Sequence, residues 1–120
     1  LNDDRHLNNI AVLEKNGRFD YCPIFDNGAG LLSNTQLSLM DIEPKRLIKS
    51  VIARPLGITF NRQMNTARAL FGKQLKIPQF TEKEITAELK LMLEFYAERD
   101  RGLITDRVTE CILERQMFNK

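Results

Sequence analysis

The chain has 120 residues, 42% of them hydrophobic and 28% charged, which fits a single globular domain of ordinary composition. The net charge of +2 indicates neither nucleic acid nor an anionic membrane as a partner, because such binding needs basic residues concentrated on one face. No apolar run reaches the ~18 residues that cross a bilayer.

The first regular element that the sequence predicts is a β-hairpin. Apolar runs at residues 10–13 and 19–24 flank Asn16-Gly17. An Asn-Gly pair between such runs favours a type I′ turn, whose two central residues both need positive φ. Pro23 lacks a backbone donor and should therefore lie near a strand end or a sheet edge.

A loop and a first helix are expected next. Residues 27–30 read Asn-Gly-Ala-Gly, a small-residue loop that can approach a ligand closely. Pro44 suits the first turn of a helix that should run to about Ala53. Arg54-Pro55 should end that helix, because the residue before a proline disfavours helical geometry.

Three more helices follow. Apolar residues from Phe60 to Phe71 recur at helical spacing, with Gly72 as the expected stop. Thr81 and Glu84 form a capping-box pattern at the start of the next helix. A last helix is expected from about Thr105. The inward residues of the last two helices are predicted to be Ile85, Leu89, Met92, Tyr96, Val108, Cys111 and Ile112, and the solvated face to be Arg107, Glu110, Glu114 and Arg115.

The expected fold class is α+β, mainly α, with one β-hairpin followed by a bundle of about four helices. Residues 1–120 are expected to form a single domain. Residues 1–33 hold the hairpin and the loops at its two open ends, and residues 34–120 form a helical subdomain.

Two polar segments flank the hairpin at its open end. Asp4 and Asn9, five positions apart, precede the first strand, and Asp26 follows the second. This spacing matches a kinase catalytic loop, Asp-x-x-x-x-Asn, followed by a metal-binding Asp. A hairpin brings its two ends together, so the three side chains can converge. Each residue alone also has an ordinary explanation as a helix cap or a turn residue.

The chemistry of phosphoryl transfer explains why these residue types would be needed. One carboxylate must orient the incoming hydroxyl and accept its proton, and hard oxygen ligands must hold magnesium against the phosphates. His6, two residues after the first acid, would either touch phosphate or brace the loop; the sequence leaves both alternatives open.

The run Asp-Arg-His-Leu-Asn-Asn-Ile-Ala-Val-Leu at residues 4–13 resembles the HipA-like serine/threonine protein kinases. The run Pro-Ile-Phe-Asp at residues 23–26 is similar to the same family. The phosphoinositide kinases share the Asp-Arg-His order but usually carry Asp-Phe-Gly where this chain has Asp-Asn-Gly. The resemblance covers residues 3–33 and is only architectural beyond them.

The resemblance implies the C-terminal lobe of an atypical protein kinase fold, with Mg²⁺ and ATP as cofactors and a protein as substrate. Asp4 and His6 would then be catalytic, and Asn9 and Asp26 would bind the cofactor and its metal. It also implies an antitoxin-like partner protein, since HipA proteins often belong to toxin–antitoxin pairs.

The expected glycine-rich loop and strand lysine do not precede Asp4 in the sequence. We therefore expect no meaningful kinase activity from these residues alone, and expect the N-terminal lobe to be a separate chain, lost, or omitted. Leu1, Leu7 and the outward hairpin side chains would then be exposed, which favours a partner chain or a homodimer.

Two alternatives stay open beside the kinase. One is a non-catalytic regulatory module derived from the same fold, and the other is a fragment of a phosphoinositide kinase-like enzyme.

The two cysteines predict a reducing compartment. Cys22 and Cys111 are far apart, and His6 is the only histidine, which excludes a disulfide framework and a zinc site of the usual spacing. We expect two buried thiols in a cytoplasmic protein.

Overall fold

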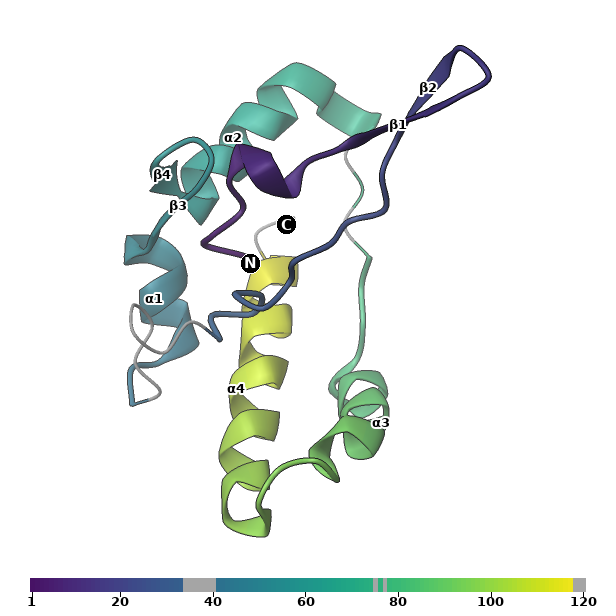
Figure 1. The fold of residues 1–120 in the computed structure, drawn as a ribbon. Helices are drawn as coiled ribbons and strands as arrows, with labels where there is room; N and C mark the ends of the chain where they lie inside the picture. The colour runs from purple at the N-terminus through teal and green to yellow at the C-terminus, as the bar shows by residue number, and fades with distance from the viewer. Residues whose placement is uncertain (34–40, 75, 77, 118–120) are drawn as a thin grey trace.

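The computed structural model describes residues 1–33, 41–74, 76 and 78–117. It confirms the expected class, α+β and mainly α, with a hairpin followed by helices (Figure 1). Residues 34–40, at the expected boundary between the two parts, lie outside the described residues. The elements in chain order are a 3₁₀ turn (Leu7–Asn9), β1 (Val12–Lys15), β2 (Arg18–Tyr21), α1 (Pro44–Ser50), β3 (Ile52–Ala53), β4 (Ile58–Thr59), α2 (Phe60–Phe71), a second 3₁₀ turn (Gly72–Gln74), α3 (Glu82–Leu93) and α4 (Glu98–Met117).

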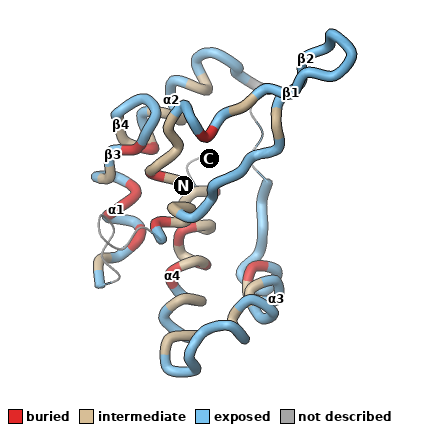
Figure 2. The backbone as a smooth tube through the Cα atoms, in the orientation of Figure 1, coloured by how far each residue is buried: buried red, intermediate tan, exposed pale blue. Residues whose placement is uncertain are grey.

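The predicted β1–β2 hairpin is present. Lys15 pairs with Arg18 across a two-residue loop in which Asn16 and Gly17 have φ of 56° and 71°, as a type I′ turn requires. Every residue of both strands is exposed, and the hairpin projects from the body of the molecule (Figures 1 and 2). Its geometry therefore comes from the turn and the ladder rather than from packing.

A second, shorter hairpin replaces the end of the first predicted helix. We expected that helix to reach Ala53, but α1 ends at Ser50, and β3 pairs with β4 in an antiparallel arrangement. Gly57, at φ 64°, lies in the turn between them. Arg54 and Pro55 therefore belong to a hairpin loop, and the helix is ended by extended backbone that starts at Val51.

The helix α2 begins and ends where the sequence predicted, and α3 begins where predicted but ends earlier, at Leu93. Gly72 closes α2, and the capping box of Thr81 and Glu84 is formed in full at the start of α3. The predicted inward face of α3 is largely wrong, because the helix ends at Leu93 and only Ile85 is buried. Met92 is 59% exposed and Tyr96 is 48% exposed.

The helix α4 begins at Glu98 rather than near Thr105, and its predicted solvated face is partly buried. Arg107 is 6% exposed and donates hydrogen bonds to the carbonyl oxygens of Ile42 (3.2 Å) and Leu32 (3.3 Å). Arg115 donates to Asn61 Oδ1 at 3.0 Å. The arginines of α4 thus join this helix to α2 and to the loop after β2, because long side chains can bury their stems while the guanidinium is hydrogen-bonded.

The core lies where α1, β3 and the start of α2 meet α4 (Figure 2). It consists of Leu32, Leu47, Ile48, Ala53, Phe60 and Cys111, with Leu1, Leu31, Ile42 and Val51 partly buried against it. Leu1 is therefore not an exposed apolar residue as expected, whereas Leu7 is 72% exposed. Cys111 is fully buried as predicted, but Cys22 is only half-buried.

The molecule is elongated. Its radius of gyration is 16.0 Å, against about 14 Å for a compact domain of this length. In the described part of the chain, no helix combines the length and apolar character needed to cross a membrane.

Candidate active site

The first four residues run between the loop after β2 and the second hairpin. Asn2 forms a bridge with Gly30, and Asp4 forms a bridge with Arg54. The Arg54 N–H donates to the Asp3 carbonyl oxygen at 3.0 Å. The acid predicted to be catalytic is therefore held by backbone hydrogen bonds rather than placed on a free end.

A single 3₁₀ turn sets the position of Asn9. The Asn9 N–H donates to the His6 carbonyl oxygen at 3.0 Å, and the turn ends at Asn9. Asn9 is 8% exposed, and its amide Nδ2 lies 3.4 Å from the Asp4 carbonyl oxygen. The segment from Asp4 to Asn9 thus folds back on itself and brings the Asn9 amide beside Asp4.

Arg5 joins this turn to the loop after β2. Its guanidinium donates to the Phe25 carbonyl oxygen and to Asn27 Oδ1, each at 2.5 Å. These two acceptors flank Asp26, whose φ of 53° is in the left-handed region that few non-glycine residues adopt. Arg5 thus holds the backbone on either side of Asp26.

Asp4, Asn9 and Asp26 line one cavity of about 310 Å³, together with Gly28 and Ala29. The structure therefore brings together the three residues that the spacing predicted would converge. The small side chains of Gly28 and Ala29 leave the cavity open beside the two carboxylates. An acid, an amide and a second acid facing one space can bind a hydrated divalent cation and an adjacent hydroxyl.

The donor set of this cavity fits Mg²⁺. Carboxylate and amide oxygens are hard ligands, and magnesium is commonly held by one or two carboxylates with waters or phosphate oxygens completing its shell. Within the described ranges, no cluster of three His, Cys, Asp or Glu side chains is placed to hold a metal. A cation here would thus depend on Asn9 as well as on the carboxylates. No lysine is among the described residues that line the cavity.

Asp4 also forms an ion pair that the sequence did not predict. Its Oδ1 lies 3.2 Å from Arg54 Nη1, and both side chains are about half exposed. One oxygen of the carboxylate thus faces a cation outside the metal-binding residues. Solvent screens such an exposed pair strongly.

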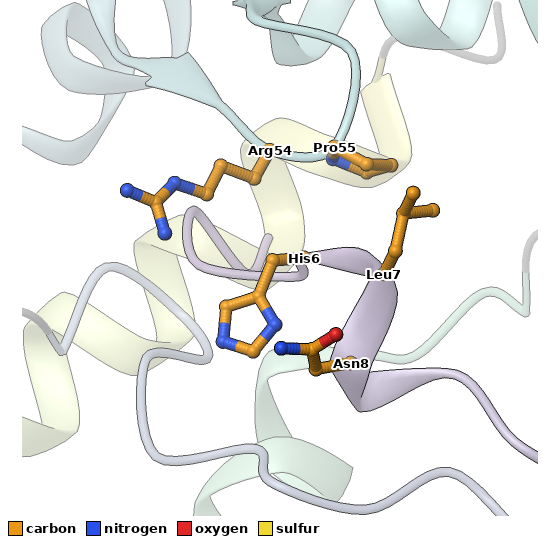
Figure 3. A pocket seen from close by; sticks show the side chains of 5 residues that line it. All are labelled: His6, Leu7, Asn8, Arg54 and Pro55. Atoms are coloured by element: carbon orange, nitrogen blue, oxygen red, sulfur yellow. The ribbon is translucent and has the colours of Figure 1, made fainter.

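His6 does not line the cavity that Asp4, Asn9 and Asp26 share. It lines a neighbouring cavity of about 560 Å³ with Leu7, Asn8, Arg54 and Pro55 (Figure 3). The two cavities meet at the ion pair between Asp4 and Arg54. The structure thus places His6 beside the acid but away from the three predicted convergent residues.

A further cavity of about 590 Å³ adjoins the base of the first hairpin. It shares Asn9 with the cavity of the two acids, and its walls are mostly apolar. Tyr21, Ile24 and Phe25 are among its lining residues. An apolar space beside a polar one suits a ligand that joins a flat apolar part to a charged part.

Sequence reasoning missed Asp3, which is 4% exposed. Burial raises the pKa of its carboxyl, and the nearby charge of Asp4 also raises that pKa. Neither carboxylate oxygen has a hydrogen-bond partner among the described residues. Asp3 lies in a turn between the bridge residues Asn2 and Asp4, and no local sequence pattern signalled its burial.

No family model, curated protein or solved structure matches this chain significantly.

Proposed function

We propose that these residues form the catalytic-loop half of a HipA-like protein kinase, which transfers the γ-phosphoryl group of ATP to a protein Ser or Thr hydroxyl. The observation that carries the proposal is the single cavity that Asp4, Asn9 and Asp26 line. Residues at the two open ends of the hairpin reach one space, in the order and spacing of a kinase catalytic loop and metal-binding acid.

The role of each residue follows from its place. Asp4 orients the substrate hydroxyl and accepts its proton while the hydroxyl oxygen bonds to the γ-phosphorus and the bond to the leaving ADP breaks. Asn9 and Asp26 would hold Mg²⁺, which neutralises charge on the phosphates when it is bound. His6 braces the catalytic turn, because its carbonyl oxygen accepts the Asn9 N–H at 3.0 Å.

The remaining parts of a nucleotide site would come from a preceding segment or from a partner chain. A lysine for the α- and β-phosphates and a glycine-rich loop are needed, and the described lining of the cavity contains no lysine. The exposed hairpin supports such a partner. Leu13 is 51% exposed, Phe19 73% and Tyr21 80%. A projecting two-stranded ribbon with apolar side chains is marginally stable alone and favours a covering chain.

The ion pair between Asp4 and Arg54 favours a second candidate, a non-catalytic regulatory module. In that alternative the pair, 3.2 Å long, serves to join the first segment to the second hairpin, and Asp4 has no proton to accept. The two candidates differ in whether the acids and amide bind a magnesium–nucleotide complex.

Isothermal titration calorimetry with ATP, with and without Mg²⁺, tests the proposal. We expect weak binding that requires Mg²⁺ and is lost in Asp26→Asn. Asp20→Asn is the matched control, since Asp20 is an exposed acid of β2 outside the cavity. ATP binding that does not require Mg²⁺, or that persists in Asp26→Asn, would contradict the kinase assignment and favour the regulatory module.

A further inference from the structure

The cavity next to Asp4 has the chemistry of an anion site. We call it the Arg54 cavity; it is lined by His6, Leu7, Asn8, Arg54 and Pro55 and measures about 560 Å³. Arg54 and Pro55 lie on one side of it, and the other three residues lie on the opposite side (Figure 3). The described residues of its lining include a guanidinium, an imidazole and an amide but no acidic side chain, so these polar groups are mainly donors.

These donors are only partly used within the chain. Arg54 directs Nη1 to Asp4, but a guanidinium has five N–H donors in a planar fork that matches phosphate or carboxylate oxygens. His6 Nδ1 is buried and has no hydrogen-bond partner among the described residues. An anion in the cavity could therefore accept from Arg54 and His6 together.

The position of the cavity indicates which molecule would carry the anion. Among the residues that the structure describes, the Arg54 cavity and the cavity of the two acids share no lining residue, and they meet at the ion pair of Asp4 with Arg54. Under the proposed function, the nucleotide occupies the side of Asn9 and Asp26, and the substrate hydroxyl lies at Asp4. Groups that flank this hydroxyl in the substrate would then reach Arg54.

We infer that the Arg54 cavity binds an anionic group, a phosphate or a carboxylate, that the protein substrate carries beside its acceptor hydroxyl. This inference rests on the proposed function for the identity of the carrier. The same guanidinium pairs with Asp4, so a bound anion competes for Arg54 and releases the carboxylate to accept a proton. Substrate recognition and activation of Asp4 are then coupled through one side chain.

The only histidine of the chain provides the probe. The imidazole resonances of His6 are followed by NMR at constant pH and ionic strength, without Mg²⁺ or nucleotide, while inorganic phosphate replaces chloride. We expect a saturable shift in the natural chain, at least tenfold weaker binding in Arg54→Gln, and an intermediate effect in Arg54→Lys, which keeps the charge but loses the fork. Arg18→Gln, at the tip of the first hairpin, is the control and should bind as the natural chain does.

Two results would overturn the inference: no saturable shift with phosphate, or equal binding in Arg54→Gln and the natural chain. Because Arg54 is exposed, the substitution should leave the fold intact, which the amide spectrum of each variant checks. Phosphoserine and N-acetylglutamate then serve as two further probes. Tighter binding of the first identifies a phosphorylated residue as the carrier, and comparable binding identifies an acidic side chain.

Asp26→Asn separates this inference from the kinase assignment. The variant should lose Mg²⁺-dependent ATP binding but keep the phosphate response of His6, because Asp26 does not line the Arg54 cavity. If Asp26→Asn and Arg54→Gln weaken phosphate binding equally, the anion lies in the cavity of the two acids and the Arg54 site is wrong. If the natural chain itself gives the phosphate response but binds no ATP in the presence of Mg²⁺, an anion site remains in a protein that is not a kinase.

Discussion

The two hairpins of this protein are built in opposite ways. The β1–β2 ribbon is regular but exposed along both strands, whereas β3 and β4 contribute only two residues each and include Ala53, which is 1% exposed. Gln63 of α2 donates to the Ala53 carbonyl oxygen at 2.9 Å and to the Ile58 carbonyl oxygen at 3.2 Å. The long hairpin is thus defined by its own turn, and the short one by what surrounds it.

This difference means that the first hairpin positions the residues of the site, whereas the second contributes to the stability of the fold. The first hairpin brings the two ends of the site together, and the second belongs to the core and presents Arg54 to Asp4. A change in the first hairpin should therefore affect local order, and a change around the second should affect the whole fold.

Matched leucine truncations give the largest expected contrast. Leu47→Ala removes a side chain that is 5% exposed and packs against the second hairpin in the core, and should lower the free energy of unfolding by about 2–5 kcal/mol. Leu13→Ala, at a β1 position that is 51% exposed, should change it by less than about 0.5 kcal/mol. Urea unfolding followed by circular dichroism measures both; equal losses would show that the first hairpin is part of the core.

Glycine substitutions in the two turns give a smaller contrast. Gly57 and Gly17 have φ of 64° and 71°, and an added Cβ would meet no atom within 4 Å at either position. The strain of each alanine is therefore conformational, about 1–2 kcal/mol. Gly57→Ala should lower global stability by that amount.

Gly17→Ala should leave the global transition in place and only speed amide exchange within β1 and β2. Hydrogen exchange followed by NMR separates the two results. A fall in global stability in both variants would contradict the division between the hairpins.

Asp3 tests the junction between the first segment and the second hairpin. Its pKa is raised by burial, so ionisation at neutral pH disfavours the folded state. The folded carboxyl holds its proton to higher pH than the unfolded one, and stability falls as pH rises through the folded pKa. Asp3→Asn should therefore stabilise the protein at pH 7 and have no such effect at pH 3, where the carboxyl is protonated in both states. Thermal unfolding at the two pH values checks this, with Asp20→Asn as the exposed control.

The reactivity of the two thiols compares the first hairpin with the core without any mutation. Cys22, half-buried at the end of the first hairpin, should react with Ellman's reagent at pH 8 in the folded protein. Cys111 is fully buried, and burial raises the pKa of its thiol from 9.0 to about 11, so it should react only after unfolding. Equal rates would mean that the core opens as readily as the hairpin.

The raised thiol pKa also predicts a pH dependence. Between pH 9 and 11 the unfolded chain loses the Cys111 proton and the folded chain keeps it, so stability should fall as pH rises. The fall should be shallower in Cys111→Ala, which isolates this thiol from the other groups that titrate in the same range.

The parts of the fold that were predicted correctly have local signals. Asn16-Gly17 specifies its own turn, Gly72 closes α2, and the Thr81–Glu84 capping box fixes the start of α3. The second hairpin was missed because a β-strand of two residues has no period to detect, and because X-Pro was interpreted only as the end of a helix.

The residues of the site also divide into those that local sequence predicts and those that only the tertiary fold brings together. The convergence of Asp4, Asn9 and Asp26 could be predicted because the residues lie at the ends of one hairpin. Arg54 is far along the chain and reaches Asp4 only through the tertiary fold. The burial of Asp3 and of Arg107 also depends on elements that pack from elsewhere, which no local pattern encodes.

The guanidinium of Arg5 has a consequence for engineering the molecule. It anchors the base of the first hairpin through Phe25 and Asn27, so the ribbon beyond that anchor carries none of the acids or the amide of the cavity. A fluorescent tag or an epitope inserted between Asn16 and Gly17 would break the turn of the ribbon, but the Arg5 hydrogen bonds should still hold the backbone on either side of Asp26. The tip of this ribbon is therefore a suitable position for a probe that detects binding of a partner chain to the hairpin.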